Sequence, residues 1–273
     1  EAAALWLRWA SWRKRVGMTH PTQSTVGKVA LRLRNQWMQQ GGVGKNDRIY
    51  LFDSVLALYA LATTQPDLVD GPHFRSQVTK SLDPLVNGSS PVLDQQEINR
   101  WSCGWHPHLL KTVAWLRNLE PFFPNSTQLA EHLYQRLMPA LSDPFQIQYT
   151  HALCYALEGS YLLGRFGPDS RQQLSRLAEV QLVDGGLPAY TNRQDGPTQG
   201  DCTAQAVRLW SAIGPDTFAE QIEAGKAYLA CQQSTEGAIF YRCNSKDRNT
   251  WTTLFADQAL RSTKEELEPS EWI

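Results

Sequence analysis

Several apolar stretches rich in Ala and Leu begin with a residue that could do chemistry. Asp201 and Cys202 begin the stretch Asp-Cys-Thr-Ala-Gln-Ala-Val-Arg-Leu-Trp, and His151 begins His-Ala-Leu-Cys-Tyr-Ala-Leu. A carboxyl, an imidazole and a thiol can each transfer a proton or share in covalent chemistry. Asp201, His151 and Cys202 are therefore candidate catalytic residues.

Further polar and aromatic residues stand at similar places and are candidates for binding a substrate. Aromatic rings stack on sugars or stabilise cations, and His titrates near neutral pH. The structural alternative is that an Asp caps a helix, that a His is hydrogen-bonded in the core, and that most of the rings are core residues. The candidates are Asp53, Trp105, His106, His108, Tyr155, Tyr190, Tyr241 and Trp251.

The sequence indicates neither a metal nor a cofactor. His106 and His108 form a His-x-His pair, a spacing that occurs in metal sites, but no third ligand stands at a matching spacing. We therefore expect a site that works without metal and without cofactor.

These candidates belong to a repeat of about fifty residues, and a fixed period of this length is typical of repeat architectures. Five apolar stretches start at 53, 106, 151, 201 and 251, and segment 1–16 could add a sixth. Amphipathic stretches with charged residues at helical spacing alternate with them, at 27–40, 74–86, 127–141, 169–182 and 216–232. Each unit is thus predicted to pair an inner apolar helix with an outer amphipathic helix.

The repeat predicts an all-α protein, an α/α toroid made of five to six helix hairpins with inner and outer helices. In such a ring the inner helices run parallel, so their N-termini gather at one mouth of a central cavity. An ordinary helical bundle or an open solenoid is the alternative. We expect one domain over residues 1–273; because residue 1 is Glu rather than Met, it could be part of a longer protein.

Composition and charge exclude several classes of partner. The chain has 26 basic and 27 acidic residues and a net charge of −1, so we expect no nucleic-acid partner. The five cysteines form no C-x-x-C pair, which argues against a disulfide framework and favours the cytoplasm.

No apolar run reaches the roughly 18–20 residues that span a bilayer. The aromatic and basic segment Leu5–Arg15 could contact a membrane surface or dock a missing domain.

The stretch from Gln181 to Tyr190, followed by Gly200-Asp-Cys-Thr-Ala-Gln, resembles the repeat of squalene and oxidosqualene cyclases. These enzymes belong to the terpenoid cyclase and protein prenyltransferase-like α/α toroids. The resemblance implies that the Gln ties one helix end to the start of the next and that the glycines allow a tight turn. It also implies that Asp201 matches the aspartate that protonates the substrate. The stretch from Gln232 to Tyr241 is similar to a degenerate second copy.

The resemblance covers roughly residues 160–260 and departs from the family at several positions. Gln199 and Cys202 stand where bacterial cyclases have further aspartates, although oxidosqualene cyclases tolerate both changes. Leu187 and Ala238 stand where an aromatic residue is expected. Complete class II cyclases also combine two toroidal domains and place their site between them, whereas this chain has the length of one.

Three functions remain open at this stage. The first is a class II terpenoid cyclase-like isomerase or lyase that starts the cyclisation of an isoprenoid in the cavity. The second is a sugar or uronate epimerase or lyase, because the segment from Tyr149 to Gly159 resembles the pocket helices of such α/α-barrels. It would use arginines near the predicted mouth, namely Arg48, Arg100, Arg193, Arg242 and Arg248. The third is a non-catalytic binding or scaffold domain.

Overall fold

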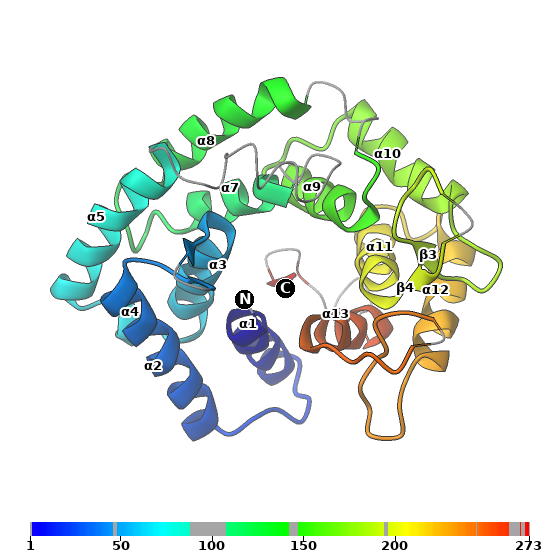
Figure 1. Cartoon of the computed structure of the whole chain (residues 1–273), viewed down its shortest axis with the longest axis horizontal. Helices are drawn as coiled ribbons and strands as arrows, with labels where there is room; N and C mark the ends of the chain where they lie inside the picture. The colour runs from blue at the N-terminus through cyan, green and yellow to red at the C-terminus, as the bar shows by residue number, and fades with distance from the viewer. Residues whose placement is uncertain are drawn as a thin grey trace. The chain divides into compact units, whose positions relative to one another are not determined.

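The structure is a computed structural model that describes residues 2–45, 48–87, 108–141, 147–193, 196–243, 245–261, 268 and 271–272. Helices make up most of these residues, and the strands among them are two short antiparallel pairs (Figure 1). The predicted all-α class is therefore confirmed. The chain divides into two compact units, Glu1–Ser142 and Asp143–Ile273.

The first unit places apolar helices in one layer and amphipathic helices in another. Helix α3 packs against α1 and α7, while α2 contacts α5 and α5 contacts α8. Nearly every residue of α3 is buried, as expected for an inner helix. The elements are α1 (Ala2–Arg15), α2 (Gln23–Gln40), β1 (Gly44–Lys45), β2 (Arg48–Ile49), α3 (Leu51–Thr64), α4 (Pro66–Val69), α5 (Pro72–Asn87), α7 (Leu109–Asn118) and α8 (Ser126–Leu141).

The second unit repeats this arrangement around α11. Helix α11 packs against α9 and α13, and α10 and α12 contact these three helices from the other layer. The first eleven residues of α11 are all buried, whereas α10 buries only Gln173, Leu174 and Leu177. The elements are α9 (Thr150–Leu162), α10 (Pro168–Glu179), β3 (Leu187–Pro188), β4 (Thr198–Gln199), α11 (Gly200–Ile213), α12 (Ala219–Cys231) and α13 (Thr250–Arg261).

The structure confirms the individual helices that the repeat predicts. The five apolar helices begin at Leu51, Leu109, Thr150, Gly200 and Thr250, close to the predicted starts. The five amphipathic stretches correspond to α2, α5, α8, α10 and α12. Closure of these hairpins into one ring, and a single domain over the whole chain, stay predictions.

A Gln-to-Gly turn occurs twice in the second unit. Gln181 Nε2 donates to the carbonyl oxygens of Gly185 (2.8 Å) and Gln221 (3.0 Å), and Gln221 lies in the first turn of α12. Gln233 Nε2 donates to the carbonyl oxygen of Gly237 in the same way, at 3.3 Å. Gly185 has a φ of 84°, and a Cβ there would lie 2.2 Å from a backbone oxygen, so only glycine fits. Gln181 therefore ties the end of α10 to the first turn of α12, which is the next amphipathic helix along the chain.

The N-terminal segment forms the helix α1 of the first unit. Leu5, Leu7 and Trp12 are buried, and α1 packs against α3 and α2. These apolar side chains therefore belong to the core of the unit, which supports the prediction of a sixth inner helix. Contact with a membrane surface or with a missing domain stays a prediction. Among the described helices, none has both the length and the apolar character needed to cross a bilayer.

Candidate active site

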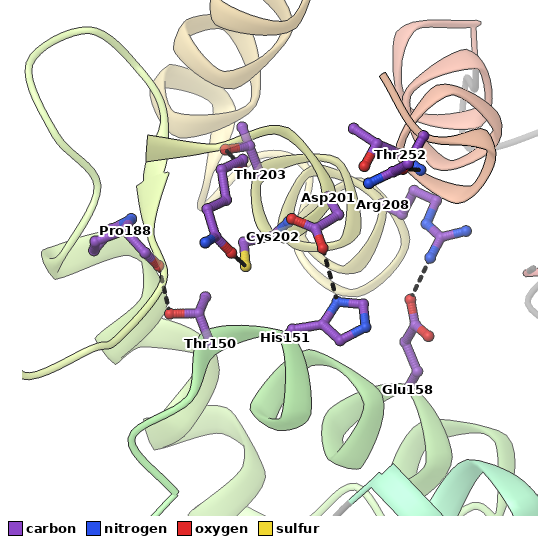
Figure 2. A network of polar contacts seen from close by, with 11 residues as sticks. Thr150, His151, Glu158, Pro188, Asp201, Cys202, Thr203, Arg208 and Thr252 are labelled. Atoms are coloured by element: carbon purple, nitrogen blue, oxygen red, sulfur yellow. Dashed lines mark hydrogen bonds and ion pairs between the residues drawn. The ribbon is translucent and has the colours of Figure 1, made fainter. Parts of the chain in front are cut away.

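His151 and Asp201 meet at the start of two neighbouring helices. Each is the second residue of its helix, His151 in α9 and Asp201 in α11. His151 Nδ1 lies 3.6 Å from Asp201 Oδ2, and both residues are buried, at 8% and 2% exposure (Figure 2). The structure thus brings together two residues that are fifty positions apart in the sequence.

Cys202 completes the cluster. Its backbone N–H donates to Asp201 Oδ1 at 2.9 Å, and its buried thiol lies 3.5 Å from Gln199 Oε1. One ligand atom from each of His151, Asp201 and Cys202 lies within 4.8 Å of the others. The three residues expected to be catalytic therefore form one buried group.

Strand β3 holds the two helix starts together. The Thr150 hydroxyl donates to the carbonyl oxygen of Pro188 at 2.7 Å, which fixes the first residue of α9 to the strand (Figure 2). The backbone N–H of Leu187 donates to the Thr203 hydroxyl at 2.9 Å, which fixes the first turn of α11 to the same strand. Because β3 follows the Gln-to-Gly turn, this turn indirectly positions the cluster.

Burial governs the ionisation of the cluster. Burial raises the pKa of Asp201 to about 6, although the hydrogen bond from the Cys202 backbone N–H favours the anion. Burial and the neighbouring Asp201 carboxyl also raise the pKa of the Cys202 thiol. Asp201 can therefore hold a proton close to neutral pH, as a carboxylic acid catalyst must.

Aromatic rings surround His151. Its ring centroid lies 4.6 Å from that of Tyr155 in an edge-on arrangement, 6.1 Å from Tyr149 and 6.3 Å from Phe255. The ring centroid of Tyr149 in turn lies 5.5 Å from that of Tyr190. Two candidate binding residues, Tyr155 and Tyr190, therefore lie close to the cluster. The surroundings of the acid are thus rich in ring faces and edges.

The remaining candidates differ in their placement. Burial raises the pKa of Tyr241 to about 12, and the charge of Asp201 contributes, so Tyr241 also lies near the cluster. Trp251 is half-buried in the first turn of α13. Asp53 and His108 belong to the first unit, where the buried His108 ring lies 5.0 Å from Phe52. Trp105 and His106 lie outside the described residues.

Three residues of the site were not among the sequence candidates. Tyr149 has its pKa raised above the usual range by burial, with smaller contributions from Cys202, Tyr241 and Asp201. It stands two residues before His151, and this proximity was the available signal. Phe255 and Gln199 had no comparable signal, because their contacts with the cluster come from the packing of α13 and from the end of strand β4.

A second polar group lies two helical turns further along the same helices. Glu158, Arg208 and Gln258 each stand seven residues after His151, Asp201 and Trp251, a spacing of about two turns. Arg208 donates to Glu158 Oε1 at 2.7 Å (Figure 2). It also donates to Gln258 Oε1 at 2.7 Å, and all three residues are at most 1% exposed. This network joins α9, α11 and α13.

The donor atoms of the cluster also match those that bind metal ions. An imidazole nitrogen, a carboxylate oxygen and a thiol sulfur are the ligands found in zinc sites, and His151, Asp201 and Cys202 supply one of each. The sequence predicted no metal, because its only spacing signal was the His106 and His108 pair. No protein-family model and no curated protein matches this chain.

Proposed function

We propose that this chain is a terpenoid cyclase-like enzyme in which Asp201 starts the cyclisation of an isoprenoid by donating a proton. The observation that carries the proposal is the position of Asp201, a buried carboxyl at a helix start, 3.6 Å from His151 and beside Cys202. The Asp-Cys-Thr-Ala segment, with its resemblance to oxidosqualene cyclases, supports the same assignment.

The proposed step moves one proton and one electron pair. The Asp201 carboxyl transfers its proton to a terminal alkene carbon or to an epoxide oxygen of the substrate. The alkene π pair forms the new C–H bond, or the epoxide C–O bond breaks, and a carbocation results. The π pair of a second alkene then attacks the cation and closes the ring, which moves the positive charge to another carbon. Loss of a proton from a carbon beside that charge forms the product alkene and balances the proton that Asp201 donated. His151 stabilises the Asp201 carboxylate that remains, because the two side chains already lie within ion-pair distance.

The surroundings of the acid suit a cationic intermediate. Ring faces stabilise cations by about 0.5–2 kcal/mol each, and more where water is excluded. Tyr149, Tyr155 and Phe255 lie around His151, and Tyr241 lies near Asp201. We include in the proposal that the chain is an α/α toroid and that the protein works in the cytoplasm.

The test is product formation from polyprenyl and squalene-type substrates by the wild type and by Asp201→Asn. Asn keeps the size and the acceptor of the side chain but has no transferable proton. We expect turnover to fall by roughly 10²–10⁴-fold, the usual contribution of a positioned acid. Asp169→Asn is the matched control, because Asp169 is the second residue of α10 and is exposed; its turnover should equal that of the wild type.

The carbohydrate alternative rests on the Tyr–His pair. The Tyr155 ring lies 4.6 Å from His151, and a His with a neighbouring Tyr can relay protons at carbon. Wild type that turns over no isoprenoid but shows His151-dependent activity on an oligosaccharide or uronate would reject the cyclase proposal in favour of this one. Absence of turnover on both substrate classes would favour a scaffold domain.

A further inference from the structure

We propose that His151, Asp201 and Cys202 form a three-ligand binding site for a divalent cation of the zinc type. The ligand atoms are His151 Nδ1, a carboxylate oxygen of Asp201 and Cys202 Sγ. This inference uses the same residues as the proposed function but does not depend on it, since a cation can bind whether or not the protein is a cyclase.

The spacing of the ligand atoms suits a tetrahedral ion. Zinc lies about 2.0–2.3 Å from nitrogen, oxygen and sulfur ligands, so that ligand atoms around it are roughly 3.3–3.7 Å apart. His151 Nδ1 and Asp201 Oδ2 are already 3.6 Å apart, which is longer than a hydrogen bond and suited to two ligands of one ion. All three atoms lie within 4.8 Å of one another, so a small movement of a side chain closes the site.

Charge balance favours occupation of this buried site. A divalent ion away from water needs anionic partners, and the Asp201 carboxylate and the Cys202 thiolate together neutralise it. Cation binding must therefore release protons, so its affinity must rise with pH.

The ligand types select the cation. A thiolate with an imidazole prefers zinc, cobalt or similar ions over magnesium and calcium, which prefer oxygen ligands. Three protein ligands leave a fourth position for water or for a substrate atom. An ion at this site would occupy the carboxylate of Asp201 and prevent it from acting as an acid, so zinc should inhibit the proposed cyclisation.

The direct test is a cobalt titration of the chain after dialysis against EDTA, followed by absorption spectroscopy. We expect one equivalent of Co²⁺ to bind with the visible bands of tetrahedral cobalt and a thiolate-to-cobalt charge-transfer band. Cys202→Ser should lose the charge-transfer band, and His151→Gln should weaken binding at least tenfold. Cys231→Ser is the control, because Cys231 is an exposed thiol at the end of α12, and its spectrum should match that of the wild type.

Circular dichroism of each variant distinguishes loss of binding from loss of fold, and we expect every variant to keep its helices. A charge-transfer band that persists in Cys202→Ser, or wild type that binds Co²⁺ no more tightly than Cys202→Ser, overturns the cation site. Turnover assays with EDTA and with added Zn²⁺ separate the two proposals. Inhibition by Zn²⁺ supports the cation site together with the cyclase, whereas turnover that requires Zn²⁺ supports the cation site and rejects Asp201 as the acid.

Discussion

The inner helices of the two units share a plan but differ in what lies between them. In the second unit, polar groups join the helices, with His151 against Asp201 and Arg208 against Glu158. In the first unit, rings join them. Trp115 of α7 lies 5.3 Å from Phe52 and 6.1 Å from Tyr59 of α3, and the Arg8 guanidinium of α1 lies 4.4 Å from the Tyr59 ring.

This difference shows that the same helical arrangement can place either polar groups or aromatic rings between its helices. Asp53 and Asp201 both stand in the first turn of a buried helix, and burial raises the pKa of both. Only Asp201 has an imidazole at ion-pair distance and a thiol beside it among the described residues. The neighbours of a carboxyl, and not its place in the repeat, therefore determine whether it can take part in catalysis.

The largest expected effect is that of breaking the buried ion pair of the second unit. Glu158→Gln leaves the Arg208 charge buried without its carboxylate, and we expect a loss of about 3–5 kcal/mol in the free energy of unfolding, measured by chemical denaturation. Glu223→Gln is the control, because the exposed Glu223 lies 3.8 Å from Lys226 and should change stability by about 0–1 kcal/mol. Equal effects of the two substitutions would mean that polar contacts do not hold the second unit together.

The next effect concerns Asp201 and pH, measured in EDTA. The pKa of Asp201 is raised from 3.8 to about 6 in the folded state. Between pH 3.8 and about 6 the carboxyl loses its proton in the unfolded chain but keeps it in the folded one. The free energy of unfolding therefore falls as pH rises, by about 3 kcal/mol across the whole range. Asp201→Asn removes this loss and should be more stable than the wild type at pH 8 but not at pH 3. A difference that does not change with pH would show that Asp201 is solvated and is no buried acid.

The smallest effect is expected for Asp53→Asn in the first unit. Burial also raises the pKa of Asp53, so the free energy of unfolding again falls as pH rises past the unfolded pKa. The Asn variant should therefore gain stability relative to the wild type as pH rises. Because the Asp53 side chain is half-buried, solvent screens it more, and the gain should be smaller than for Asp201→Asn. The same pH series of thermal denaturation checks both variants. A larger gain for Asp53→Asn would place the more strongly buried carboxyl in the first unit.

The sequence by itself determined the helices and the turns that connect them. Apolar and amphipathic periodicity depends on neighbours within a few positions, so it located α3, α9 and α11 within two residues of their observed starts. The Gln-to-Gly turn was expected from the resemblance to the cyclase repeat, and its bond spans only four residues of the chain, from Gln181 to Gly185. His151, Asp201 and Cys202 were identified as chemistry-bearing residues from their types and their places at helix starts.

The tertiary structure alone decided which of these residues meet. His151 and Asp201 are fifty positions apart along the chain, and the bonds of β3 to the starts of α9 and α11 hold these two helices so that the two side chains meet. The Glu158 and Arg208 pair was missed, because a charge inside an apolar helix has no local pattern that names its partner fifty residues away. Contacts between helices depend on packing of side chains across the core, which periodicity along one chain segment does not encode.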